Sequence, residues 1–214
     1  MENNQLIKYD NGQLAKVENA IAITNKLLTL RENIDEYFYL DKGNLKAHSN
    51  DFVGAIEDYT NAIGINPQFA IAFNNRGTAK GNLNDYFGAI EDYTKAIEIN
   101  PQFGTSYSSR GSSKFNINEF LEAIEDFTKA IEINILDSTS YCGRGASKHM
   151  INDYLGAIED YTKAIEIERQ LEGIRDELPE AFFGRAKAKA KIGDFEGSKK
   201  DNMISNLYKL RVKT

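Results

Sequence analysis

The stretch AIEDYTKAIEINPQF, residues 89–103, recurs along the chain with small changes. The other copies are AIEDYTNAIGINPQF at 55–69, AIEDFTKAIEIN at 123–134 and AIEDYTKAIEIE at 157–168. The leading alanine of each copy follows the previous one after 34 residues, as from Ala55 to Ala89. A fixed period of this size marks a repeat array, in which each unit buries its apolar face against its neighbours. The sequence therefore predicts one elongated array.

The period also predicts where the units begin and end. We expect four regular units and a degenerate fifth unit with a C-terminal cap, at 36–69, 70–103, 104–137, 138–171 and 179–214. Residues 1–35 repeat poorly, but apolar residues at steps of three and four predict an amphipathic helix that caps the first unit as a degenerate half-repeat. The fifth unit needs an insertion at 172–178, which we expect to extend the preceding helix, with a loop as the alternative.

Each unit is expected to contain two helices. The first should begin near an aromatic residue, namely Tyr39, Phe73, Tyr107 or Tyr141. It should end at an Asn followed by an acid: Asn50-Asp51, Asn84-Asp85, Asn118-Glu119 and Asn152-Asp153. Asn tolerates the left-handed conformation of a tight turn, and Asp suits the N-cap of the second helix better than Glu119 does. Pro67 and Pro101 should stop two of the second helices. This pattern predicts an all-α solenoid of antiparallel helix pairs.

A glycine stands in the middle of every regular first helix, at Gly43, Gly77, Gly111 and Gly145. Glycine inside a helix costs about 1 kcal/mol relative to alanine. We expect close approach of the two helices to explain it, with each glycine crossing the leading alanine of the second helix and the bulky Tyr or Phe residues filling the space on either side.

These residues resemble the tetratricopeptide repeat (TPR) over about residues 36–212. The second unit carries the pattern as Phe73, Gly77, Tyr86, Ala89, Tyr93, Ala96 and Pro101. The sequence departs from the family where Arg or Lys precedes the glycine, and where Ile135 and Arg169 replace the proline. The resemblance implies a right-handed α-solenoid whose concave groove, lined by the first helices, binds another protein or an extended peptide.

The resemblance also implies which residues face this groove, and unlike the framework they vary between units. They are Tyr37, Leu40, Asn44 and Ala47, then Ile71, Asn74, Thr78 and Gly81, then Thr105, Ser108, Ser112 and Phe115, then Thr139, Cys142, Ala146 and His149. Drift on a solvated face is the structural alternative. One branch of the family binds acidic chaperone tails, but Leu40, Thr105 and Ser109 stand where its cations are required. We therefore do not expect chaperone-tail binding.

A basic pair spaced by four residues recurs in every unit, as in Arg110 and Lys114. An aspartate follows the first member after 16 residues on the second helix, as Asp126 follows Arg110. The alternatives are a cationic ladder for an acidic ligand and an ion-pair ladder within the fold. Because both charges occur in all five units, we favour the ion-pair ladder.

The composition of the chain argues against several classes of binding partner. The net charge is -6, which disfavours nucleic acid and anionic membranes, and no apolar stretch is long enough to span a membrane. The single cysteine fits a cytoplasmic protein.

The sequence offers one candidate catalytic pair, Cys142 and His149. They lie two helical turns apart, too far for a nucleophile and its base, and they lack further metal ligands. We therefore predict no enzymatic activity, metal site or cofactor. The expected function is a protein- or peptide-binding scaffold, with self-assembly into a homo-oligomer as the alternative.

Overall fold

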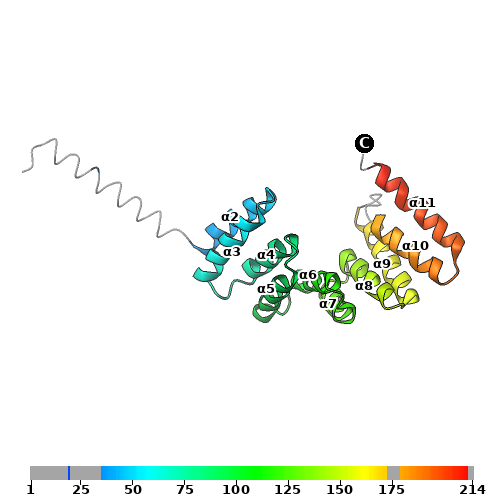
Figure 1. The fold of residues 1–214 in the computed structure, drawn as a ribbon, viewed down its shortest axis with the longest axis horizontal. Coiled ribbons are helices and arrows are strands. Elements are labelled where there is room, and N and C mark those ends of the chain that lie inside the picture. Colours follow the sequence, from blue (N-terminus) through cyan, green and yellow to red (C-terminus); the bar gives the residue numbers. More distant parts are fainter. Residues whose placement is uncertain (1–18, 20–34, 173–178, 212–214) are drawn as a thin grey trace, which may run out of the picture.

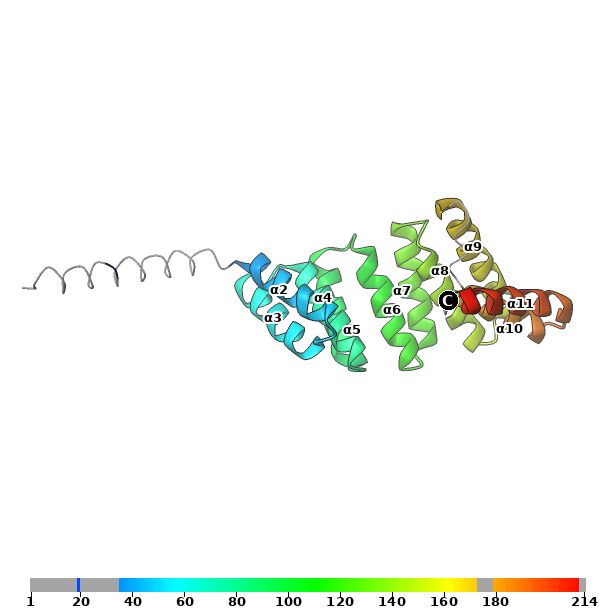
Figure 2. The same cartoon turned by 90° about the horizontal axis from the view of Figure 1, so that it is seen from above.

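The protein is described by a computed structural model that covers residue 19 and residues 35–172 and 179–211. Its helices form five pairs: α2 (Glu36–His48) with α3 (Phe52–Ile65), α4 (Ala70–Asn82) with α5 (Tyr86–Ile99), α6 (Gly104–Asn116) with α7 (Phe120–Ile133), α8 (Ser138–Met150) with α9 (Tyr154–Glu172), and α10 (Pro179–Lys191) with α11 (Phe195–Arg211). The pairs follow one another along the long axis of the molecule (Figures 1 and 2). The described residues contain no strand, so the fold is an all-α solenoid. None of the described helices has the length and apolar character that crossing a membrane requires.

Two expected segments fall largely outside the described residues. The cap over residues 1–35 is described only at Asn19 and Asp35, and the insertion at 172–178 only at its first residue, Glu172. Helix α9 is described over 19 residues, up to Glu172, where α7 has 14. Continuation of the helix towards Leu178 stays a prediction.

The turns within the pairs have the predicted chemistry. The four Asn residues that follow the first helices have positive φ angles: 62° at Asn50, 62° at Asn84, 65° at Asn118 and 66° at Asn152. The carboxylate of Asp85 then accepts a hydrogen bond from the backbone N–H of Gly88 at 3.0 Å, and so caps α5. Glu119 makes no such side-chain cap on α7, as expected for its longer side chain.

The first helices begin three residues earlier than expected. Helix α2 begins at Glu36 and α4 at Ala70, ahead of the aromatic residues Tyr39 and Phe73. At the start of α2, the Asp35 carboxylate accepts from the N–H of Phe38 at 2.9 Å and caps the helix, whereas α4 and α6 have no such side-chain cap. The first turns of α4 and α6 already contain buried residues, Ala72 and Ser106, ahead of the aromatic residue.

Asparagine marks the end of the second helices more consistently than proline does. Helix α7 ends at Ile133 although Ile135 replaces the proline. The side-chain oxygen of Asn134 accepts from the N–H of Leu136 at 3.1 Å, which closes a turn. Glu168 stands at the equivalent place in the fourth unit, and there α9 continues.

Aromatic rings fill the space beside the mid-helix glycines, as expected. A Cβ on Gly43 would lie 2.6 Å from the Tyr59 ring, and one on Gly111 would lie 3.2 Å from the Phe127 ring. At Gly77 and Gly145 the oxygen of the leading alanine is also among the nearest atoms, at 3.2 and 3.3 Å. Alanines such as Ala55 are completely buried in the same crossings. A ring carbon is the nearest atom at Gly43, Gly77 and Gly111, whereas at Gly145 the Ala157 oxygen and the Tyr161 ring are equally close.

The ion-pair ladder is confirmed in all five units. In the third unit, Arg110 and Lys114 both contact Asp126, at 2.7 and 2.8 Å, and the Asp126 side chain is only 5% exposed. Arg110 also donates from Nη1 to the hydroxyl of Thr94 in the preceding unit at 3.0 Å. Arg76, Arg144 and Arg185 repeat this bridge to Thr60, Thr128 and Thr162. Each arginine therefore fixes its own helix pair and the pair before it.

Candidate functional site

The first helix of each pair lies on the inner side of the solenoid. Helix α6 contacts both α4 and α8, and α8 contacts α10, whereas α5 and α7 make no comparable contact with each other among the described residues. Helices that touch along the array lie on its shorter, inner side. The inner face is therefore built from first helices, as the family resemblance implied.

Three adjoining cavities form a groove along α4, α6 and α8, which we call the inner groove. Their volumes are about 580, 270 and 480 Å³. Ser112 lines all three, Ser109 links the first and second, and Asn116 links the second and third. The groove is therefore continuous across three units, with Ser112 at its centre.

Many of the residues expected at a binding surface line this groove. They are Thr78, Gly81, Thr105, Ser108, Ser112, Phe115, Thr139, Cys142 and Ala146. They are mostly small, which leaves the groove open. The structure brings together the expected residues of the second, third and fourth units.

The other expected residues lie elsewhere. Leu40 and Asn74 are each only 7% exposed, and the side-chain oxygen of Asn74 accepts from Ser106 Oγ at 2.9 Å. They belong to the packing between helices and offer little surface to a ligand. Tyr37 and Ile71 are 57% and 45% exposed but lie outside the three cavities.

Asn44 and His149 also lie outside these cavities. Asn44 accepts hydrogen bonds from Tyr59 Oη at 2.9 Å and from Asn75 Nδ2 at 3.0 Å, so it ties two units together. The ring of His149 packs edge-on against Tyr154, with centroids 5.2 Å apart. Burial lowers the pKa of His149, and the positive charges of Lys187 and Lys191 lower it further. The imidazole ring is therefore neutral at pH 7.

Sequence reasoning missed much of the lining of the groove, including Ser109, Asn116, Phe127, Gly143 and Glu180. Asn116 lies one helical turn beyond Ser112, so helical spacing could have found it. Glu180 occupies the place of Thr139 in the degenerate fifth unit. Phe127 comes from a second helix and forms the floor, which only the packing reveals.

Several polar groups of the groove offer hydrogen-bond acceptors. Ser112 Oγ donates to the carbonyl of Ser108 at 3.0 Å, and Thr78 Oγ1 donates to that of Asn74 at 3.1 Å. Asn116 Nδ2 donates to the carbonyl of Ser112 at 2.8 Å. A hydroxyl that has donated its hydrogen keeps lone pairs as acceptors. The groove is therefore suited to bind N–H donors, such as those of an extended backbone.

The groove shows no arrangement for nucleophilic catalysis. Burial, and secondarily Glu180, raise the pKa of the Cys142 thiol to about 11. Reactive cysteines have the opposite shift, because the thiolate is the nucleophile. The described residues also contain no group of three His, Cys, Asp or Glu side chains that could hold a metal ion.

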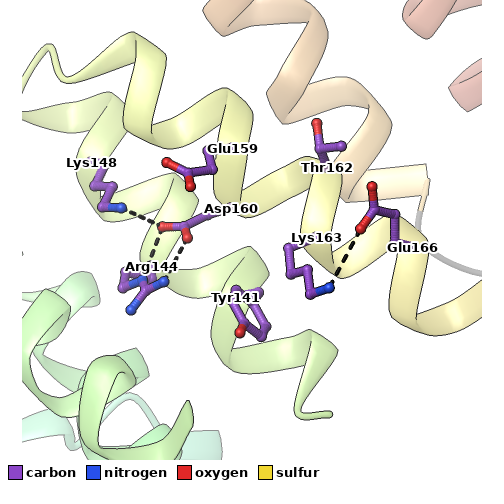
Figure 3. A pocket seen from close by; sticks show the side chains of 8 residues that line it. All are labelled: Tyr141, Arg144, Lys148, Glu159, Asp160, Thr162, Lys163 and Glu166. Atoms are coloured by element: carbon purple, nitrogen blue, oxygen red, sulfur yellow. Dashed lines mark hydrogen bonds and ion pairs between the residues drawn. The ribbon is translucent and has the colours of Figure 1, made fainter. Parts of the chain in front are cut away.

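A fourth cavity of about 550 Å³, between α8 and α9, is part of the ion-pair ladder (Figure 3). Arg144 and Lys148 point to Asp160, with contacts of 2.7 and 2.8 Å, and Lys163 lies 3.5 Å from Glu166. Three of its cationic groups are thus paired within the fold. We interpret this cavity as structural.

Comparisons with known proteins agree with this architecture. Tetratricopeptide repeat family models match residues 70–103 and 104–134. Among solved structures, one of MamA has a TM-score of 0.69 at 23% identity, covering 82% of this chain and 92% of that one. YrrB, described as a TPR protein with an unusual peptide-binding site, has a TM-score of 0.66 at 17% identity, covering 86% and 96%.

A third structure is the first TPR of Spaghetti (RPAP3) bound to the HSP90 peptide SRMEEVD. Its TM-score is 0.54 at 21% identity, and the match covers 55% of this chain and 93% of that one. No curated protein matches the sequence. The repeats, the helix pairs and the family matches together identify the chain as a member of the tetratricopeptide repeat protein family.

Proposed function

We propose that the chain is a non-enzymatic scaffold that binds an extended segment of another protein in the inner groove. The observation that carries this proposal is the continuity of the groove, because three cavities meet at Ser112. An extended peptide offers a row of backbone N–H groups, and the groove offers a row of acceptors. The repeat family and the fold support a protein-interaction scaffold, and related structures bind peptides.

The experiment compares the wild-type chain with Ser112→Arg as bait in a lysate of its own organism. Ser112 is exposed on α6, so arginine should fill the centre of the groove without disturbing the fold. Lys95→Glu is the control, because Lys95 is 59% exposed on α5 and pairs with Glu98 on the same helix. We expect Ser112→Arg to weaken capture of the specific partner by about tenfold, the effect of losing about 1.4 kcal/mol.

Both variants should keep the wild-type helicity and melting temperature. If Lys95→Glu no longer captures the partner protein and Ser112→Arg captures it fully, the inner groove is not the binding site.

Self-assembly is a second candidate, supported by exposed apolar residues in the first and last helix pairs that the structure describes. Phe38 and Leu45 of α2 are 48% and 73% exposed, whereas their equivalents in α4, Ala72 and Ala79, are buried by the preceding pair. At the other end, Phe195 of α11 is 72% exposed. Light scattering across a concentration series tests this candidate, with Leu45→Glu expected to reduce any association. A monomer at all concentrations would dismiss it.

A further inference from the structure

The cavity between α6 and α8 has an apolar interior, and we call it the α6–α8 pocket. Its volume is about 480 Å³, and Phe115, Cys142 and Ala146 form its apolar walls. Phe127 of α7 closes the floor. These side chains make this part of the inner groove suited to an apolar side chain of a ligand.

The floor differs chemically from that of the units before it. Tyr59 and Tyr93 occupy the same place in the first and second units, and their hydroxyls donate to Asn44 at 2.9 Å and to Thr78 at 3.2 Å. Phe127 has no hydroxyl. It also lies against Gly143 of the next unit, where a Cβ would come within 2.6 Å of its Cε1. The third unit thus places a purely apolar ring where its neighbours place a polar group.

The charge around the pocket is negative. Glu180, which is exposed in the first turn of α10, lines the pocket together with the acceptor-rich Ser112 and Asn116. Among the described residues, neither Lys nor Arg lines any cavity of the inner groove. On α10, Lys187 and Lys191 act on His149, and none of these three residues lines the pocket. A cationic group of a ligand would therefore meet a carboxylate and no repelling charge.

We propose that the α6–α8 pocket binds an apolar side chain of an extended peptide, and that an adjacent Lys or Arg of the peptide pairs with Glu180. This inference rests on the proposed function and adds the chemical class of the ligand. It is opposite in charge to an acidic chaperone tail.

The test begins with selection of phage-displayed random twelve-residue peptides on the full-length protein. We expect enriched sequences to share an apolar residue beside Lys or Arg. Each enriched peptide is then made with serine in place of the apolar residue, or with serine in place of the basic one. Binding measured by fluorescence anisotropy should weaken about tenfold for the first change. It should weaken about threefold for the second change, as expected for a partly exposed ion pair.

Protein variants assign these effects to the pocket. Glu180→Gln should remove the preference for the basic residue over serine, and Ala146→Leu should reduce the preference for the apolar one. Glu159→Gln is the matched control, because Glu159 is an exposed carboxylate on α9 in the separate ion-pair cavity. Circular dichroism checks that every variant retains its fold.

The chain's single cysteine reports where the peptide binds, because Cys142 lines the pocket. An enriched peptide should slow alkylation of Cys142 by iodoacetamide. Peptides that bind without slowing it would overturn the proposed function, and a selection without any enrichment would overturn both proposals. This inference alone would be overturned by either of two outcomes. One is that the peptides that protect Cys142 are acidic, and the other is that Glu180→Gln keeps the wild-type preference for a basic residue over serine.

Discussion

Replacement of Gly143 by alanine tests the packing that forms the floor of the groove. The Phe127 ring lies between two glycines, Gly111 on α6 and Gly143 on α8. A Cβ on Gly143 would lie 2.6 Å from Cε1 of this ring, about 1 Å closer than an ordinary carbon–carbon contact. The ring cannot withdraw, because it is 2% exposed and already lies 3.2 Å from the Cβ position of Gly111.

The expected change combines two opposing effects. Overpacking a well-filled site costs about 1–3 kcal/mol, and we expect the upper part of this range because the ring is confined. Alanine gains up to about 1 kcal/mol over glycine in a helix. Gly143→Ala should therefore lower the free energy of unfolding by about 1–2 kcal/mol.

Gly64→Ala is the matched control, because a Cβ at Gly64 on α3 would meet nothing within 4 Å. This variant should be more stable than wild type by about 0.5–1 kcal/mol. Denaturant unfolding followed by far-UV circular dichroism measures both. Phe127→Leu should lower the free energy of unfolding less in the Gly143→Ala variant than in the wild-type protein, because residues 127 and 143 share one contact. If Gly143→Ala gains as much stability as Gly64→Ala, the ring does not confine α8 and the reasoning is wrong.

Four further predictions concern the framework and the thiol. A double-mutant cycle between Arg110 and Asp126 should show coupling above about 0.5 kcal/mol, and strict additivity would contradict their ion pair. Asn118→Gly should melt close to wild type, whereas Asn118→Ala should lose about 1 kcal/mol at this positive φ. Burial acts to raise the pKa of Asp201. Hydrogen bonds and positive charge from Arg185 and Lys189 outweigh this effect of burial, so the pKa of Asp201 is lowered. Its stabilisation is therefore fully present above pH ~4 and lost as the pH falls towards the lower folded pKa, so Asp201→Asn should flatten acid-melting curves. Because its pKa is about 11, Cys142 should be alkylated far more slowly at pH 8 than after unfolding in urea.

Local chemistry explains why much of the framework could be predicted. Asn84 needs only its own backbone conformation to form the turn, and Asp85 caps a helix that begins at the next residue. The Arg110–Asp126 ion pair could be predicted because the same charges recur at the same spacing in every unit. Such features depend on residues close in sequence, or on a pattern that the repeat displays several times.

The residues of the candidate site were harder to predict, because burial depends on the distance between helices. Asn74 and Ser108 occupy equivalent places in successive units. Each accepts a hydrogen bond from the serine 32 residues on, yet Asn74 is buried, whereas Ser108 is only partly buried and lines the groove. Helical periodicity assigns both to one face but does not say how closely the next helix covers each of them.

The sequence by itself determined the period, the paired helices, the Asn turns and the ion-pair ladder, because repetition shows which residues are held in common. Only the tertiary structure decided that Phe127, from a second helix, forms the floor of the inner groove, and that Glu180 of the fifth unit stands at its rim. These residues are far apart in sequence and belong to different units. They meet because each helix pair packs against the next, and that packing sets the shape and charge of the surface offered to a partner.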